Sequence, residues 1–260
     1  MVTVTPAKAP RKIGLARALS KLGYCSRSRA TELIRSGRVQ LNGVVRRDAE
    51  TPVHLHKDRI AVDHAAVSAS EKTYLMLNKP RGVVTTASDE KGRKTVYHCL
   101  GEEPSWIAPV GRLDQGSEGL LLFSNDSEWA ARVLAPETHL EKIYHVQVRG
   151  QVDDEVASAL MLGVRSESGE MLRARTARVL RGGQRNTWLE VVLDEGKNRQ
   201  IRRMLEHLGL DVLRLVRVAI GPLELGELAK GAFRPLTVSE KLMLDRAMRA
   251  ASKAGSDPPC

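Results

Sequence analysis

Strand-like segments dominate the sequence from residue 73 onwards, and they do not alternate regularly with helices. Helical spacing of apolar residues predicts helices over residues 127–135, 153–162, 199–208 and 238–251. Short apolar or alternating runs predict strands at Tyr74–Leu77, Val83–Thr86, Leu120–Phe123, Ile143–Val148, Leu172–Leu180, Thr187–Leu193 and Val212–Val218. Because a doubly wound parallel fold needs regular alternation, this order favours an α+β domain: a mixed, largely antiparallel β-sheet with flanking helices.

The positive charge of the chain is concentrated before this region. The 260 residues carry a formal net charge of +10, and Met1–Asp48 holds eleven Lys and Arg against two acidic residues. Apolar residues are interleaved with these cations, which indicates a folded surface for a polyanion and not a disordered basic tail. We therefore expect two domains, with the polyanion-binding one first.

The N-terminal pattern predicts two helices followed by a hairpin. Residues 14–23 place four apolar side chains on one helical face, and Gly23 ends the run. Ser26 can cap a second helix that Gly37 terminates. The alternating residues after it lead into Asn42-Gly43, the dipeptide best suited to a two-residue hairpin turn.

This segment, LARALSKLGYCSRSRATELIRSGRVQLNGVVRRDAETPV, resembles the S-four RNA-binding module over residues 13–63. The resemblance implies that outward cations dock on folded RNA: Arg17, Lys21, Arg27, Arg29, Arg35 and Arg38. Such contacts go to phosphates, so they supply affinity without choosing the target base. A solvated charged surface without a partner is the alternative interpretation.

The remaining boundaries follow from composition. Residues 64–72 are small and polar and predict a linker, residues 73–252 form the second domain, and residues 253–260 are expected to be a disordered tail. The three cysteines and seven histidines lack the paired spacings of a disulfide framework or a metal site. No apolar run approaches the roughly 20 residues that span a bilayer. We expect a cytoplasmic monomer without a metal or membrane partner.

Residues 110–126, VGRLDQGSEGLLLFSND, form the most specific stretch of the chain. The pattern predicts that Asp114 lies in a glycine-bounded loop at a sheet edge. Taken alone, such an Asp is more often a turn or cap residue than a catalytic group. A glycosidase pair of Asp114 with Glu118 is a further alternative, although their spacing across a glycine-containing loop fixes no geometry.

Two later segments favour a catalytic interpretation. Lys142-Ile143-Tyr144 opens an alternating strand, which places the first and third side chains on one face. In DEGKNRQIRRMLEHLG a strand ends at Gly196, and a helix starts within residues 198–203.

With the opening YLMLNKPRGVVTTASDEKGRKTV and the closing VLRLVRVAIGPLELGELAKGAFRPLT, these segments resemble the pseudouridine synthases of the ribosomal, RsuA-like group, over residues 13–240. The resemblance implies that Asp114 is the catalytic nucleophile and that Tyr144 stacks on the target uracil and takes part in proton removal from carbon 5. It implies that Arg202 pairs with Asp114. Arg112 would displace or replace the flipped base. Four more residues are expected to contact substrate: Lys79, Arg81, Lys142 and Arg199.

The implied reaction is the isomerisation of uridine to pseudouridine in ribosomal RNA, or in a subunit assembly intermediate. It gains and loses no atoms, so no cofactor is expected. The closing segment favours large-subunit RNA over small-subunit RNA. A non-catalytic RNA-binding or ribosome-associated protein is the main alternative. A methyltransferase would need a glycine-rich turn in a parallel α/β domain, which the sequence does not show.

Overall fold

The computed structural model describes residues 12–101, 106–166 and 169–254. Contacts divide the chain into two units between Thr73 and Tyr74, and two short later segments group with the first unit. Each unit has hydrophobic core residues of its own.

The two helices predicted in the N-terminal unit are α1 (Leu15–Lys21) and α2 (Arg27–Arg35). Their apolar faces meet in a core that includes Leu19 and Ile34, both fully buried. The Ser26 hydroxyl accepts a hydrogen bond from the Arg29 amide at 3.1 Å, so the predicted cap of α2 is confirmed.

A hairpin of β2 (Val39–Leu41) and β3 (Val44–Arg46) follows these helices. Asn42 and Gly43 have φ angles of 54° and 80°, as a two-residue turn with both central residues left-handed requires. The predicted hairpin is therefore confirmed.

Further short strands complete the N-terminal unit. They are β1 (Ile13–Gly14), β4 (Pro52–Val53), β5 (Ile60–Val62) and β6 (Ala65–Ala66). The strand order β3-β2-β5-β6 forms one sheet, while β1 pairs with β4. Strand β6 lies within the predicted linker, which is therefore wrong for its first residues. Asp63 and His64 adopt left-handed φ angles of 48° and 67° and return the chain against β5.

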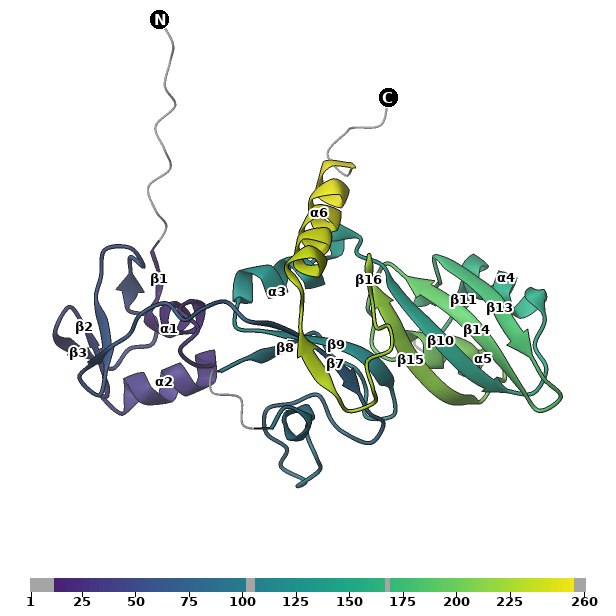
Figure 1. Cartoon of the computed structure of the whole chain (residues 1–260), viewed down its shortest axis with the longest axis horizontal. Coiled ribbons are helices and arrows are strands. Elements are labelled where there is room, and N and C mark those ends of the chain that lie inside the picture. Colours follow the sequence, from purple (N-terminus) through teal and green to yellow (C-terminus); the bar gives the residue numbers. More distant parts are fainter. Residues whose placement is uncertain (1–11, 102–105, 167–168, 255–260) are drawn as a thin grey trace, which may run out of the picture. The chain divides into compact units, whose positions relative to one another are not determined.

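In the described part of the second unit, nine strands form one sheet (Figure 1). They are β7 (Tyr74–Lys79), β8 (Ala108–Val110), β9 (Glu118–Ser124), β10 (Lys142–Arg149), β13 (Thr176–Gly182), β14 (Asn186–Leu193), β15 (Val212–Ile220), β16 (Leu223–Glu224) and β17 (Phe233–Pro235). The order is β13-β14-β10-β15-β9-β7-β17, with β8 beside β9 and β16 beside β15. Strands β9 and β15 pair in parallel, whereas β7 with β9 and β10 with both its neighbours are antiparallel. The predicted fold class is confirmed.

The helices of this part are α3 (Ser127–Leu134), α4 (Asp154–Leu162), α5 (Gln200–His207) and α6 (Val238–Ala254), with the 3-10 turns η1 (Val96–Cys99) and η2 (Pro136–Thr138). Helices α4 and α5 share a core with β10 and β14, and α3 and α6 share one with β7 and β9. Helix α6 contains residues 253 and 254 of the expected tail, and residues 255–260 lie outside the described residues. Every described helix is too short or too polar to cross a lipid bilayer.

Two predicted strands differ in the structure. Residues 83–86 form only an isolated bridge, Val84 with Thr95. The predicted strand 172–180 is divided, because Leu172 belongs to β12 (Met171–Leu172), which pairs with β11 (Val164–Arg165). The Ala174 amide then bonds to the Leu160 carbonyl in place of a strand partner, and β13 begins only at Thr176.

The parallel contact of β9 with β15 requires a glycine. Gly119 has a φ of 101°, and a Cβ there would lie 2.2 Å from the carbonyl oxygen of Arg217. Only a residue without a side chain permits this approach. It brings the loop that precedes β9 against the middle of the sheet.

Candidate active site

A cleft of about 510 Å³ opens where the loop before β9 meets β10, β15 and the start of α5. Five of the residues predicted from sequence line it: Arg112, Asp114, Lys142, Tyr144 and Arg199. A second cavity, of about 480 Å³, reaches Asp114 from the side of residues 84–93, and Arg112 lines both. The structure thus brings together side chains that are up to 87 positions apart in the sequence.

The loop that carries Asp114 is fixed by backbone contacts. The Ser117 amide donates to the Asp114 carbonyl at 3.0 Å, and the Gly82 amide donates to the Gln115 carbonyl at 2.8 Å. The Gln115 side chain returns a bond to the Gly82 carbonyl at 3.1 Å. Asp114 therefore lies in a loop whose backbone is fixed by hydrogen bonds within the loop and to Gly82.

Thr85 provides another restraint, which sequence reasoning missed because it assigned this residue to a strand. Its hydroxyl donates to the Leu113 carbonyl at 2.7 Å and accepts from the Leu113 amide at 3.3 Å. Both backbone groups of the residue before Asp114 are thus held by one side chain.

Lys79 has a different place from the one predicted. It was expected to contact substrate, but it is fully buried at the end of β7. Its ammonium donates to the carbonyls of Ser117 at 2.8 Å, Asp114 at 3.1 Å and Pro80 at 3.1 Å. The assignment as a substrate contact is wrong, because Lys79 anchors the Asp114 loop from inside the protein.

Burial sets the protonation behaviour of Lys79. It lowers the pKa of the ammonium to about 8, while interactions with Cys99, Asp114 and Glu118 act in the opposite direction.

Arg202, on α5, holds the same loop from the other side. Its Nη2 donates to the Gly116 carbonyl at 2.9 Å. The described contacts include no hydrogen bond or ion pair between Arg202 and Asp114, so the predicted direct pair is not formed in this structure. Burial, together with Arg199, lowers the pKa of Arg202, and the charge of Asp114 opposes this. The charge of Asp114 therefore acts on the guanidinium, although the guanidinium forms its hydrogen bond with the carbonyl of Gly116, two residues after Asp114.

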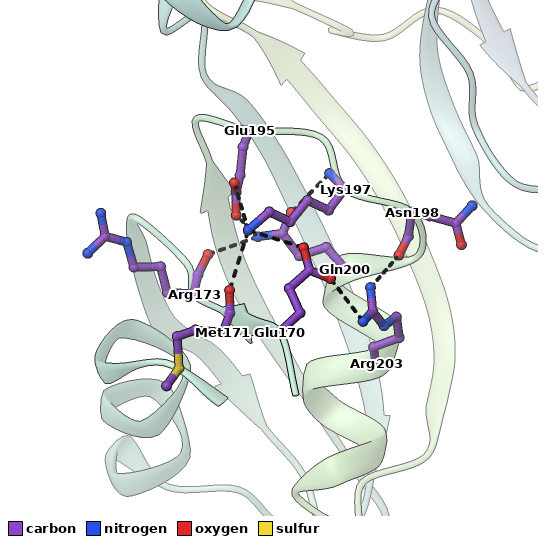
Figure 2. A network of polar contacts seen from close by, with 8 residues as sticks. All are labelled: Glu170, Met171, Arg173, Glu195, Lys197, Asn198, Gln200 and Arg203. Atoms are coloured by element: carbon purple, nitrogen blue, oxygen red, sulfur yellow. Dashed lines mark hydrogen bonds and ion pairs between the residues drawn. The ribbon is translucent and has the colours of Figure 1, made fainter. Parts of the chain in front are cut away.

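A polar network that includes Lys197 and Gln200 shapes the edge of the cleft (Figure 2). Arg199, between these two residues in the chain, has a left-handed φ of 47° and precedes α5. The buried Gln200 amide donates to the Arg173 carbonyl at 3.0 Å and to Glu195 at 2.8 Å. Its oxygen accepts from the Lys197 amide at 3.2 Å, and Lys197 Nζ pairs with Glu195 at 3.1 Å. These contacts hold the loop that presents Arg199 to the cleft.

Arg81 and Glu118 lie apart from the cleft lining. Arg81 is exposed and donates to the Leu213 carbonyl at 3.2 Å. Glu118 is buried, and both its oxygens bond to Arg214 at 3.2 Å, with Lys230 as a second cation. Burial raises the pKa of Glu118, but these two cations outweigh it and the net shift is downward. Because both oxygens are engaged, the glycosidase pair with Asp114 has no geometric support.

The six cations predicted to dock on RNA fall into two groups. Arg29 pairs with Glu32, Arg38 with Asp63 and Lys21 with Glu128. The other three, Arg17, Arg27 and Arg35, are exposed and form no ion pair within the described ranges. These three have their full charge available for a polyanion.

Comparison with known proteins decides the family. The family described as RNA pseudouridylate synthase matches residues 73–207, which is more than half of the chain, and the S4 domain matches residues 13–60. The chain belongs to the RNA pseudouridylate synthase family. This pseudouridine synthase is 36% identical over 227 residues to the ribosomal large subunit pseudouridine synthase B of Bacillus subtilis, across 87% of this chain and 93% of that protein.

Another relative and a solved structure match similar lengths of the chain and belong to the same class of enzyme. The synthase is 37% identical over 238 residues to an RNA pseudouridine synthase of Aquifex aeolicus, across 91% of this chain and 95% of the relative. A solved structure described as a pseudouridylate synthase matches with a TM-score of 0.63 and 30% identity, across 89% of this chain and 99% of that one. The synthase is therefore an isomerase with an RNA-binding module in front, and these comparisons give no support to a non-catalytic RNA-binding protein.

The contacts of Thr85 lead to a test in this synthase. Thr85→Val removes the hydroxyl at nearly constant volume, so we expect kcat for pseudouridine formation to fall about tenfold, with KM little changed, because Leu113 and Asp114 lose a positional restraint. Steady-state release of tritium from RNA labelled at carbon 5 of uridine measures both constants. Thr85→Ser keeps the hydroxyl and should restore most of kcat. An unchanged kcat in Thr85→Val would show that the two bonds are not needed to position the loop.

Proposed function

We propose that this pseudouridine synthase isomerises uridine in ribosomal RNA, favouring the large-subunit RNA, with Asp114 as its nucleophile. The observation that carries the catalytic assignment is the single cleft that Asp114 and Tyr144 line from separate segments. Similarity to the large-subunit synthase of Bacillus subtilis supports the RNA class.

The reaction needs a nucleophile and a base but no external reagent. The bond from nitrogen 1 of uracil to carbon 1′ of ribose breaks, the ring turns, and carbon 5 bonds to carbon 1′. Carbon 5 loses its proton and nitrogen 1 gains one, so atoms and charge balance. The Asp114 carboxylate attacks either carbon 1′ or the uracil ring; both routes use the same residue. Tyr144, on the cleft wall, stacks on the base and takes part in removing the proton from carbon 5.

Arg202 serves as the counter-ion of Asp114 in the RNA complex. Bound RNA excludes water from the cleft, and an ionised carboxylate then requires a nearby cation. The charge of Asp114 already acts on the Arg202 guanidinium, and release of its bond to the Gly116 carbonyl would free it to pair directly with the carboxylate.

Extraction of the target uridine is the task of Arg112. A uridine inside folded RNA must leave its stack at a cost of a few kcal/mol, and an inserted side chain offsets part of this cost. Arg112 is exposed and lines both cavities beside Asp114, so it can enter the space that the base vacates. Arg199 and Arg81 contact neighbouring phosphates in this proposal.

Mapping of pseudouridines tests the substrate. We expect ribosomal RNA from cells without this protein to lack pseudouridine at one or a few positions of the large-subunit RNA, and complementation to restore them. Sequencing after pseudouridine-specific chemical labelling gives the positions. Losses confined to small-subunit RNA would contradict the large-subunit assignment, and an unchanged ribosomal map would contradict ribosomal RNA as substrate.

The three predicted docking cations that form no ion pair give a second expected result. Replacing Arg17, Arg27 and Arg35 together by Gln should raise KM about tenfold or more and leave kcat unchanged, because phosphate contacts bind RNA without entering the chemistry. The slope of log affinity against log salt should fall by about one for each phosphate that the variant no longer binds. Filter-binding titrations at several salt concentrations measure it. Arg59→Gln, an exposed cation outside the two helices, is the matched control; an equal loss of affinity there would argue for a general effect of charge.

A further inference from the structure

Arg217, on β15, lines the same cleft as Asp114 but takes no part in the chemistry proposed for Asp114 and Tyr144. It is 6% exposed. Its Nε donates to the Leu120 carbonyl at 2.8 Å, which holds the guanidinium against β9. Its Nη2 is buried and has no hydrogen-bond partner in the described part of the chain. A buried donor without a partner is costly, so this nitrogen calls for an acceptor that arrives with a ligand.

The sheet fixes where this guanidinium lies. Arg217 is paired with Tyr144 of β10 on one side and with Gly119 of β9 on the other. Arg217 therefore lies between Tyr144, which is proposed to stack on the base, and Gly119, near the start of β9 after the Asp114 loop. The Gly119 backbone locks β15 at this point, since a Cβ there would collide with the Arg217 backbone.

Lys142 is a second cation on the same wall of the cleft. Its side-chain ammonium forms no hydrogen bond or ion pair with any of the residues that the structure describes. Burial lowers the pKa of Lys142 and so does the charge of Arg217, while Asp194 acts in the opposite direction. Arg217 and Lys142 are thus two cations that line the same cleft and repel one another, and no carboxylate of the described residues bonds to either.

Two kinds of acceptor on an RNA could meet the free nitrogen of Arg217. A uracil carbonyl would satisfy the donor but is neutral, so it would leave the repulsion between the cations in place. A phosphate both accepts the hydrogen bond and compensates the charge, and guanidinium groups bind phosphate well because their donors match its geometry. The negative charge of a phosphate therefore favours it over a uracil carbonyl as the acceptor for Arg217.

We propose that Arg217, together with Lys142, binds a backbone phosphate next to the target uridine and so holds the flipped nucleotide beside Asp114. This proposal rests on the function proposed above and adds a specific contact to it. It makes Arg217 a substrate-binding residue, with the contact directed at the backbone and not at the base.

The test pairs a protein variant with a change in the RNA. A stem-loop that carries the mapped uridine is prepared with natural linkages or with a neutral methylphosphonate in the linkage on the 5′ or the 3′ side of that uridine. For the wild-type chain, we expect one of the two substitutions to lower kcat/KM between about tenfold and a hundredfold. Arg217→Gln should lower kcat/KM by a similar factor with natural RNA and show little further reduction with the same methylphosphonate. Arg217→Lys retains the charge and should recover part of the activity.

Controls separate this contact from other roles of Arg217. Arg149→Gln removes an exposed arginine paired with Asp211 at the end of β10, and it should keep the full methylphosphonate effect. If the effects of Arg217→Gln and the methylphosphonate multiply, or if neither methylphosphonate affects the wild-type chain, the phosphate contact is refuted. The wild-type measurement needs no variant, so it holds even if Arg217→Gln folds poorly. A wild-type chain that forms no pseudouridine in any ribosomal RNA would instead refute the proposed function.

Discussion

Asp114→Asn should abolish pseudouridine formation, with kcat reduced by at least about 10⁴-fold, while the chain folds and binds RNA as before. The exchange replaces one carboxylate oxygen by an NH2 group, which keeps the shape of the side chain but removes the nucleophile. Losses of this size are typical when the attacking group of an enzyme is removed. The backbone of the loop is held through its carbonyl and amide groups, so the substitution leaves those bonds intact. Tritium release from uridine-labelled RNA and filter binding measure the two properties separately.

A matched exchange guards against a general effect of charge. Asp211→Asn alters an exposed carboxylate that pairs with Arg149, and it should retain full activity. In cells, the Asp114→Asn chain should fail to restore the pseudouridines that the wild-type chain restores. Restoration by the Asn variant would show that Asp114 is not the nucleophile and that another group of the cleft performs this step.

The parts of the fold that carry a strong local signal could be predicted. The Asn42-Gly43 turn follows from the two left-handed positions that its residue types tolerate. The α+β class follows from the order of strands and helices, since β9 and β10 are long and strongly patterned. Strands of two or three residues, such as β6 and β17, contain too few residues for a period to be visible. Their existence depends on partners distant in the sequence.

The candidate site could be predicted only in part, for the same reason. Asp114 and Tyr144 lie in recognisable motifs, and the structure places both on one cleft. The support beneath them depends on tertiary contacts that leave no local pattern: the Thr85 hydroxyl meets Leu113 across 28 positions. Arg217 looks like any outward cation of a strand until its register with Gly119 is known.

For Arg202, the sequence predicted the neighbouring residues correctly but not the group to which its side chain bonds. Its motif indicated a cation near Asp114, and the charge of Asp114 does act on it. The hydrogen bond that it forms goes to the Gly116 carbonyl instead. Sequence reasoning identified the residue and its neighbourhood, whereas the choice between a carboxylate and a carbonyl separated by two residues depends on side-chain geometry.

Lys79→Met should lower kcat by about 10²-fold with a smaller change in KM, because the ammonium joins the carbonyls of Asp114 and Ser117 from beneath the loop. Methionine fills a similar volume but donates nothing, so the loop is free to shift, and displacement of a catalytic group by about 1 Å can cost this much. Single-turnover tritium release measures the effect on chemistry. Lys94→Met, at an exposed lysine, is the control and should be as active as the wild-type chain. Full activity in Lys79→Met would show that the anchor is dispensable.

The buried ammonium of Lys79 also predicts how stability depends on pH. Its pKa is about 8 in the folded chain against an ordinary value of 10.5, so between these two values the unfolded chain binds more protons than the folded one. The free energy of unfolding should therefore rise with pH across this window, by up to about 3 kcal/mol, and be independent of this group below pH 8. Urea unfolding at pH 7.5, 9 and 10, compared with Lys79→Met, isolates the contribution because groups that do not interact with Lys79 titrate alike in both chains. A difference between the two chains that stays constant or falls with pH would show that Lys79 is not held in a desolvated site.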